Sequence, residues 1–168
     1  MMHPNRVKFI KNRYSDVSSI GIELGVARGV FSKQILESCP KTFLYSVDAW
    51  AGDRYHNEKE MQFCQNSLEP FFPRSYIIQS YFNDLVNKFP NEFFDFIYID
   101  GYAHTGQNQG STLHEWFPKL KKGGIFSGHD YHKKWPKTIA QVDAFSKQNK
   151  LEINIITDSP YDSWWMEK

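Results

Sequence analysis

The chain has 168 residues, a length that suits one domain with a buried core of its own. Its composition, with 40% hydrophobic and 23% charged residues, is that of a globular protein. A net charge of +1 gives no support for nucleic-acid binding, which needs a clustered basic surface. No apolar run approaches the length of a membrane span.

The cellular compartment is predicted from the cysteines and the start of the chain. Cys39 and Cys64 are too few for a disulfide scaffold, and reduced thiols are typical of an intracellular protein. Residues 1–14 are polar and basic, without the apolar core of a signal peptide. We therefore expect a cytoplasmic protein that binds neither nucleic acid nor membrane.

Short apolar runs alternate with helical patterns along the chain. Residues 1–18 are expected to form an N-terminal helix or extension. Strands are predicted at Ile20–Leu24, Thr42–Val47, Tyr76–Ile78, Phe94–Ile99 and Ile125–Ser127. Helices are predicted at Gly29–Ser38, in the later part of Asp53–Leu68, and at Phe82–Phe89, Ser111–Leu120 and Thr138–Gln148. Gly123-Gly124 predicts a turn before the fifth strand.

The last two strands are predicted to pair with each other. Glu152–Ile156 and Ser163–Met166 are joined through Asp158-Ser159-Pro160, and so tight a connection indicates an antiparallel hairpin. The preceding alternation indicates an α/β fold, a mostly parallel sheet covered by helices on both faces. The whole chain, 1–168, is interpreted as one domain. Ligands of such sheets bind at the carboxyl ends of the strands.

The loop after the first strand contains Glu23, Gly25 and Gly29 in the sequence Glu-Leu-Gly-Val-Ala-Arg-Gly. The glycines allow a ligand to approach the backbone, but the G-x-G-x-x-G dinucleotide fingerprint is absent, which argues against NAD. A carboxylate at Glu23 suits a cationic amino-acid ligand and disfavours a pyrophosphate.

The loop after the second strand reads Val47-Asp48-Ala49-Trp50. Asp48 is placed to accept the hydroxyls of a ribose, and Trp50 to cover an adenine. The alternative for Asp48 is a turn or helix cap.

These loops together resemble the class I methyltransferases that use S-adenosylmethionine (SAM). The resemblance includes Tyr98-Ile99-Asp100-Gly101, Leu120-Lys121-Lys122-Gly123-Gly124-Ile125 and Gly128-His129-Asp130-Tyr131. It extends from about Ile20 to the end and is strongest to small-molecule and sugar O-methyltransferases. The family implies a Rossmann-like three-layer sandwich, with seven strands of which the last is antiparallel.

The resemblance also implies which residues bind the cofactor. Glu23 and Gly25 would line the amino-acid end of SAM, and Asp48 would hold the ribose. The implied cofactor-binding set is Glu23, Gly25, Val26, Gly29, Phe31, Ser32, Asp48, Trp50, Ser80, Tyr81 and Asp100. The segment Ala51–Phe72 is expected to be either a lid over SAM, walled by Tyr55, His56 and Phe63, or a surface helix.

Asp100, His129 and Asp130 are the predicted metal ligands. Related metal-dependent enzymes hold a divalent ion here that orients the acceptor hydroxyl and lowers its pKa. The histidine stands where several relatives have a carboxylate, so Mg²⁺, Mn²⁺, Zn²⁺ and no metal all stay open. The implied catalytic residues are Asp100, Tyr102, His104 and His129, with His132 as a further candidate base.

The expected function is methyl transfer from SAM to a hydroxyl of a small molecule, with a sugar as the preferred acceptor. The alternative is a SAM-binding module that transfers no methyl group and acts as a partner or regulatory domain. The expected partners are a small-molecule acceptor and either a second copy, in a homodimer, or a fused neighbouring domain. A nucleic-acid methyltransferase is disfavoured because Asp100-Gly101-Tyr102 replaces the Pro-Pro motif of that class. A metal-assisted hydroxylase or hydrolase on the same fold also stays open.

Overall fold

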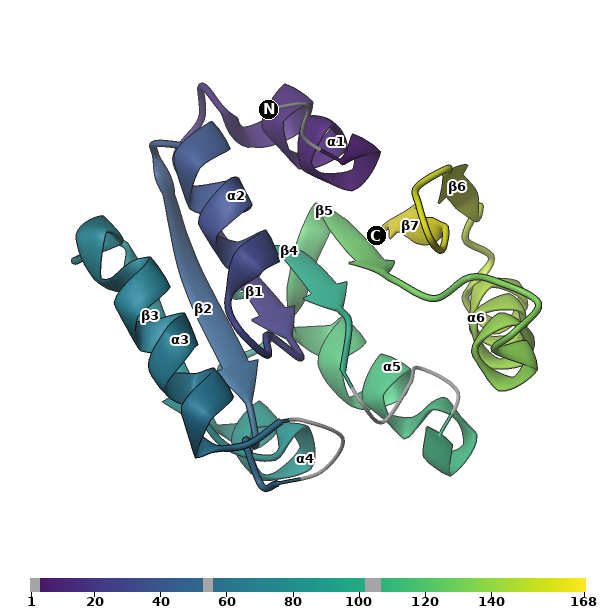
Figure 1. The fold of residues 1–168 in the computed structure, drawn as a ribbon. Coiled ribbons are helices and arrows are strands. Elements are labelled where there is room, and N and C mark those ends of the chain that lie inside the picture. Colours follow the sequence, from purple (N-terminus) through teal and green to yellow (C-terminus); the bar gives the residue numbers. More distant parts are fainter. Residues whose placement is uncertain (1–3, 53–55, 102–106) are drawn as a thin grey trace.

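The structure is a computed structural model that describes residues 4–52, 56–101 and 107–168. Seven strands form one sheet in the order β3-β2-β1-β4-β5-β7-β6 (Figure 1). Their bounds are Ser19–Leu24 (β1), Thr42–Asp48 (β2), Ser75–Gln79 (β3), Phe94–Ile99 (β4), Leu120–Gly128 (β5), Asn154–Ile156 (β6) and Ser163–Glu167 (β7). β1 to β5 pair in parallel, whereas β7 pairs antiparallel with both β5 and β6. The predicted fold class and terminal hairpin are confirmed.

Helices cover both faces of the sheet, as the alternating pattern predicted (Figure 1). Their bounds are Asn5–Tyr14 (α1), Val30–Ser38 (α2), Glu58–Leu68 (α3), Phe82–Leu85 (α4), Ser111–Trp116 (α5) and Pro136–Asn149 (α6). Short 3-10 turns follow or precede several of them, at Glu69–Phe71, Val86–Lys88, Gln107–Gly110 and Phe117–Lys119. None of the helices in the described ranges is long and apolar enough to cross a membrane.

Two hydrophobic cores lie on opposite faces of the sheet. β4 shows the division, because Ile97 and Ile99 belong to one core while Phe96 and Tyr98 belong to the other. Successive side chains of a strand point to opposite faces, so a strand covered on both sides is apolar throughout. The first core is packed by α4, α5 and α6, and the second by α1, α2 and α3.

Two predicted boundaries are wrong for a local reason. The predicted turn at Gly123-Gly124 lies within β5, which already begins at Leu120. The pairing of β4 with β5 shifts register there, and Gly123 has a φ of 73°, so the glycines form an irregularity inside the strand. The predicted helix over Ser111–Leu120 ends as an α-helix at Trp116, before Pro118.

Candidate active site

Two cavities meet at the carboxyl ends of β1, β2 and β4. One of about 380 Å³ lies between Asp48, Ser80, Tyr81 and the start of α5. The other, of about 560 Å³, lies between Glu23, Phe31, Asp100 and Arg6 of α1. Gly25 and His56 line both, so the cavities adjoin at the loop after β1. Parallel sheets bind ligands at this edge, because the strand ends leave a crevice there.

Gly25 is the residue that brings two strand ends close together. Its φ is 97°, a conformation that favours glycine. A Cβ at this position would lie 2.3 Å from the Cα of Gly101 and 2.4 Å from the carbonyl oxygen of Asp100. Any side chain here would therefore push the β1 and β4 loops apart and fill the place where the two cavities meet.

Asp48 is buried and its carboxylate is used by its own chain. One oxygen accepts from the backbone N–H groups of Val26 (3.0 Å) and Ala27 (2.9 Å), and lies 2.9 Å from Nδ1 of His56. The other accepts from the N–H of Trp50 at 3.0 Å. Burial raises the pKa of Asp48, but the bonds from His56, Trp50 and Ala27 outweigh it and hold the pKa below its usual value. The carboxylate stays ionised and positions the β1 loop.

Glu23 is the second buried carboxylate. Only 2% of it is exposed, and it lines the larger cavity. Ser32 of α2 donates to it, and the Ser32 hydroxyl lies 2.8 Å from that of Ser46. Burial raises the pKa of Glu23 to about 8, which is only partly opposed by the Ser32 hydrogen bond. At neutral pH this group therefore holds a proton until a cation approaches it.

Trp50 lies in the core and not at the cavity beside Asp48. Its ring belongs to the core under α3, is 4% exposed, and donates from Nε1 to the Ala27 carbonyl at 2.9 Å. Trp50 does not line the cavity beside Asp48 but lines another cavity together with Gln79, and its contact with an adenine stays a prediction. Ala49 and Ala51 line the cavity beside Asp48 instead, together with the predicted Ser80 and Tyr81.

Of the other predicted cofactor-binding residues, some line a cavity and others lie behind its lining. Val26 and Phe31 line the larger cavity. Gly29 and Ser32 line neither cavity: Gly29 precedes α2 with a φ of 76°, and Ser32 is buried beneath Glu23. Sequence reasoning missed Asn83, Asn108, Ser111, Thr112 and Glu115, whose polar side chains carry no motif.

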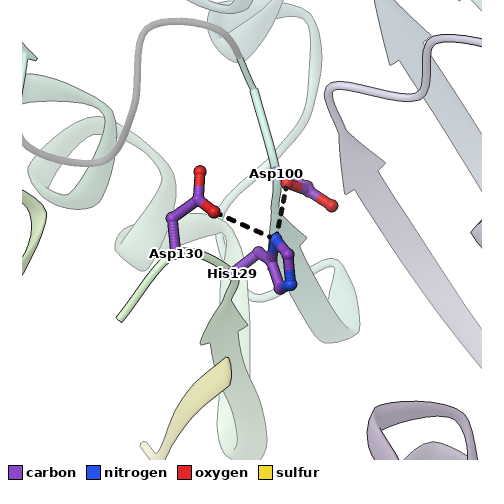
Figure 2. A group of neighbouring side chains, drawn as sticks. All are labelled: Asp100, His129 and Asp130. Atoms are coloured by element: carbon purple, nitrogen blue, oxygen red, sulfur yellow. Dashed lines mark ion pairs between the residues drawn. The ribbon is translucent and has the colours of Figure 1, made fainter. Parts of the chain in front are cut away.

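The three predicted metal ligands lie together at the ends of β4 and β5 (Figure 2). Nδ1 of His129 lies 3.4 Å from Oδ1 of Asp100 and 3.2 Å from Oδ1 of Asp130. One donor atom from each residue lies within 4.8 Å of the others. Asp130 lies two residues after the end of β5 and has a φ of 61°. Of the three, Asp100 lines the larger cavity.

His129 is held as a cation by its two neighbours. Burial lowers its pKa, but the hydrogen bonds with Asp100 and Asp130 outweigh burial and raise the pKa to about 9. The imidazolium then donates from Nδ1 and is no base at neutral pH. Its Nε2 is buried without a hydrogen-bond partner among the described residues. A divalent cation bound here would replace the charge that this proton supplies.

Two predicted catalytic residues, Tyr102 and His104, lie outside the described residues, as does Tyr55. His132 does not belong to the Asp100–His129–Asp130 group. Its Nδ1 accepts from the N–H of Lys134 at 3.2 Å, and its ring packs 5.1 Å from that of Tyr161.

The segment Ala51–Phe72 contains α3, which packs against α2 on one face of the sheet. In α3, Cys64 and Leu68 are fully or almost fully buried in the core shared with α2. Phe63 is 46% exposed and packs against Arg28, 5.2 Å from its ring centre, so it forms no wall with His56. Of the described part of the segment, Ala51, His56 and Glu60 reach the cavities. The lid over SAM and the surface helix both stay predictions for this segment.

The chain belongs to the methyltransferase domain family, whose model matches residues 22–131, more than half of the sequence. The match begins in β1 and ends just past β5, so it includes every strand end described above. A comparison with curated protein sequences finds no match.

Solved structures with the same fold include several methyltransferases. An O-methyltransferase from Bacillus cereus in complex with SAH is 14% identical, with a TM-score of 0.72 over 100% of this chain and 83% of that one. The O-methyltransferase NovP is 19% identical, with a TM-score of 0.71 over 98% and 79%. Precorrin-6y C5,15-methyltransferase from Geobacter metallireducens is 12% identical, with a TM-score of 0.73 over 98% and 86%. Because these neighbours include both O-methyltransferases and a precorrin methyltransferase, the fold alone does not define the acceptor.

Proposed function

We propose that this protein transfers a methyl group from SAM to a hydroxyl of a small molecule, with a sugar as the preferred acceptor. The observation that carries the proposal is the place of Asp100. Its carboxylate belongs to the Asp100–His129–Asp130 cluster and also lines the cavity that contains Glu23. A group that binds hydroxyls or a metal therefore adjoins the predicted donor site.

The residues at the two cavities fit SAM. The smaller cavity has the size and the mixed lining expected for an adenosine, with the Asp48 carboxylate at its base. The larger one has Glu23 for a cationic amino-acid group. The Bacillus cereus O-methyltransferase of the same fold is in complex with SAH, which is what remains of SAM after methyl transfer.

SAM supplies a methyl group that is already activated by its sulfonium. The protein then has to bind SAM and the acceptor hydroxyl in line and to exclude water. Asp100 would accept a hydrogen bond from the acceptor hydroxyl. His129, as an imidazolium, would shield Asp100 and Asp130 from each other's charge. Proton removal is assigned to His104, which follows β4 in the sequence.

The Asp100, His129 and Asp130 donor set also fits a divalent ion. Two carboxylates and one imidazole suit Mn²⁺ better than Mg²⁺, which prefers oxygen ligands alone. Such an ion would supply a positive charge that lowers the pKa of the acceptor hydroxyl. The chain's own contribution is to hold the three side chains, through β4 and β5, within reach of one ion.

A sugar is favoured by the surroundings of the cluster. The ring of Tyr161 lies 6.3 Å from that of His129, 5.1 Å from His132 and 6.2 Å from Trp135. Aromatic faces beside carboxylates suit a ligand that has apolar faces and hydroxyl edges.

The test has two stages. Calorimetry would first measure SAM binding to wild type and to Asp48→Ala, each with and without Mn²⁺ or Mg²⁺. A loss of more than about tenfold in the variant, roughly 1.4 kcal/mol, supports the cofactor site when thermal unfolding shows that the variant is folded, since Asp48 also positions the β1 loop. Methyl transfer to a panel of sugars, phenols and amines would follow. Binding without turnover on any acceptor would favour the SAM-binding module, and no binding would contradict the proposal.

A further inference from the structure

The first turn of α1 is tied to the opposite end of the chain. Asp158, in the connection between β6 and β7, accepts hydrogen bonds from the backbone N–H groups of Asn5 (2.8 Å) and Arg6 (3.0 Å). Asn5 also donates from Nδ2 to the carbonyl of Thr157 at 2.8 Å. The residue before the helix, Pro4, has no side chain that can cap it. The carboxylate of Asp158 therefore caps the N-terminus of α1. These bonds hold Arg6 at one place beside the sheet.

The guanidinium of Arg6 lines the larger cavity and lacks partners for two of its nitrogens. Its Cζ lies 5.0 Å from the ring centre of Phe31, over the first turn of α2. Nε and Nη1 are buried, yet neither has a hydrogen-bond partner among the described residues. Buried charged donors without acceptors are unfavourable, so their presence in a cavity indicates that a ligand supplies the acceptor.

The other guanidinium of this cavity, that of Arg28, is already used. Arg28 donates from Nε and from Nη2 to the two carboxylate oxygens of Glu60, the second at 2.8 Å. Its side chain is also 60% exposed. Arg28 is thus paired through two of its nitrogens and lies mostly in solvent, whereas the two unpartnered nitrogens of Arg6 are buried.

The charges around the cavity match a zwitterion. Glu23 and Asp100 contribute carboxyl groups, and Arg6 contributes the cation. An α-amino acid carries an ammonium and a carboxylate on one carbon, and so requires both kinds of group close together. Guanidinium donors bind carboxylates with strong, charge-assisted hydrogen bonds.

We infer that Arg6 binds the carboxylate of the amino-acid end of SAM, while Glu23 receives its ammonium, an inference that rests on the proposed function. The N-terminal helix, which lies before the part that matches the family model, then completes the cofactor site. Asp158 is a positioning residue, since it acts through the backbone of Arg6.

The test is a cycle of two changes, one in the protein and one in the ligand. Calorimetry would measure the binding of SAM and of decarboxylated SAM, which keeps the ammonium and the sulfonium but lacks the carboxylate. The variant is Arg6→Met, whose apolar stem still packs on Phe31. We expect Arg6→Met to weaken SAM binding by more than about tenfold and to change the binding of decarboxylated SAM by less than about twofold.

The matched control is Arg13→Ala, which removes the same kind of side chain from a more exposed position of the same helix. It should leave the affinity for both ligands unchanged. Thermal unfolding would check that each variant is folded, and Arg6→Gln serves as a second variant if Arg6→Met is not.

Equal losses for both ligands in the Arg6 variants would overturn the inference and make Arg6 a structural residue. No loss for either ligand would overturn it as well. If wild type binds neither ligand, the proposed function fails together with the inference. If wild type binds both ligands and only the Arg6 effect is missing, the proposed function stands without it.

Discussion

Two acidic groups at the carboxyl edge of the sheet use their oxygens differently. At the end of β2, Asp48 contacts four donors of its own chain, three of them backbone N–H groups. At the end of β4, the carboxylate of Asp100 has His129 as its one hydrogen-bond or ion-pair partner in the described residues. A carboxylate saturated by backbone donors holds a loop in place, whereas one with oxygens left over is available to a ligand.

The largest expected effect is the loss of Asp48. Asp48→Ala leaves the buried or partly buried N–H groups of Val26, Ala27 and Trp50 without their acceptor, at about 1–3 kcal/mol for each buried group. We expect the free energy of unfolding to fall by roughly 3 kcal/mol or more. Asp100→Ala is the matched change at the end of β4, and it should lower the free energy of unfolding by less than about 1 kcal/mol. Urea denaturation of both variants is the measurement, and equal losses would contradict the comparison.

The next prediction concerns metal binding at Asp100 and its two neighbours. If Asp100, His129 and Asp130 bind Mn²⁺, a concentration of about 100 times Kd stabilises the folded protein by roughly 2.7 kcal/mol. For a chain of this size that raises Tm by roughly 5–10 °C. Thermal scans with Mn²⁺, Mg²⁺ and EDTA would measure the shift. Asp100→Asn should abolish it and Glu60→Gln, a carboxylate outside the cluster, should not. A shift that survives in Asp100→Asn would place the metal elsewhere.

Glu23 makes stability fall as pH rises. Its pKa is raised from 4.5 to about 8 in the folded protein, so between these two values the unfolded chain loses this proton first and unfolding is favoured. Glu23→Gln removes the effect. We expect the wild type to lose roughly 2 kcal/mol more than this variant between about pH 6.5 and pH 8.5. Denaturation curves at several pH values check this, and parallel pH profiles would show that burial of Glu23 is unimportant.

The smallest expected effect is that of His56. Its ring is the one side chain that contacts the Asp48 carboxylate in the described residues, and it lines both cavities. His56→Ala keeps the backbone N–H bonds, so we expect a loss of less than about 1 kcal/mol in stability. It also opens a position on Asp48 for a ribose hydroxyl. SAM affinity should therefore rise, by roughly twofold to fivefold, as measured by calorimetry. A fall in affinity would instead make His56 a ligand contact.

Much of the fold followed from local patterns. The apolar runs of β1, β2 and β4 were placed to within a residue, because strands covered on both faces are apolar throughout. The hairpin of β6 and β7 followed from the short connection between them. The boundaries of β5 did not, since a glycine pair is typical both of a turn and of an irregularity inside a strand, and only pairing with β4 decides between them.

The site was predictable in part. Asp100, His129 and Asp130 follow neighbouring strands, so their proximity could be expected from topology alone. The place of Trp50 was not predictable, because a large aromatic beside a loop motif can face either a ligand or the core, and only the tertiary structure shows that its ring is buried under α3. Arg6 was missed because no motif surrounds it, and only docking of α1 on α2 brings it to the cavity.

The sequence by itself therefore determined the order of strands and helices, the glycine at position 25 and the acidic residues at the strand ends. Each of these depends on local backbone preference or on the period of apolar residues. The tertiary structure decided which side chains are saturated and which have donors or acceptors left. That distinction separates Asp48 from Asp100 and Arg28 from Arg6, and it depends on partners far apart in the chain, such as Asp158 and α1.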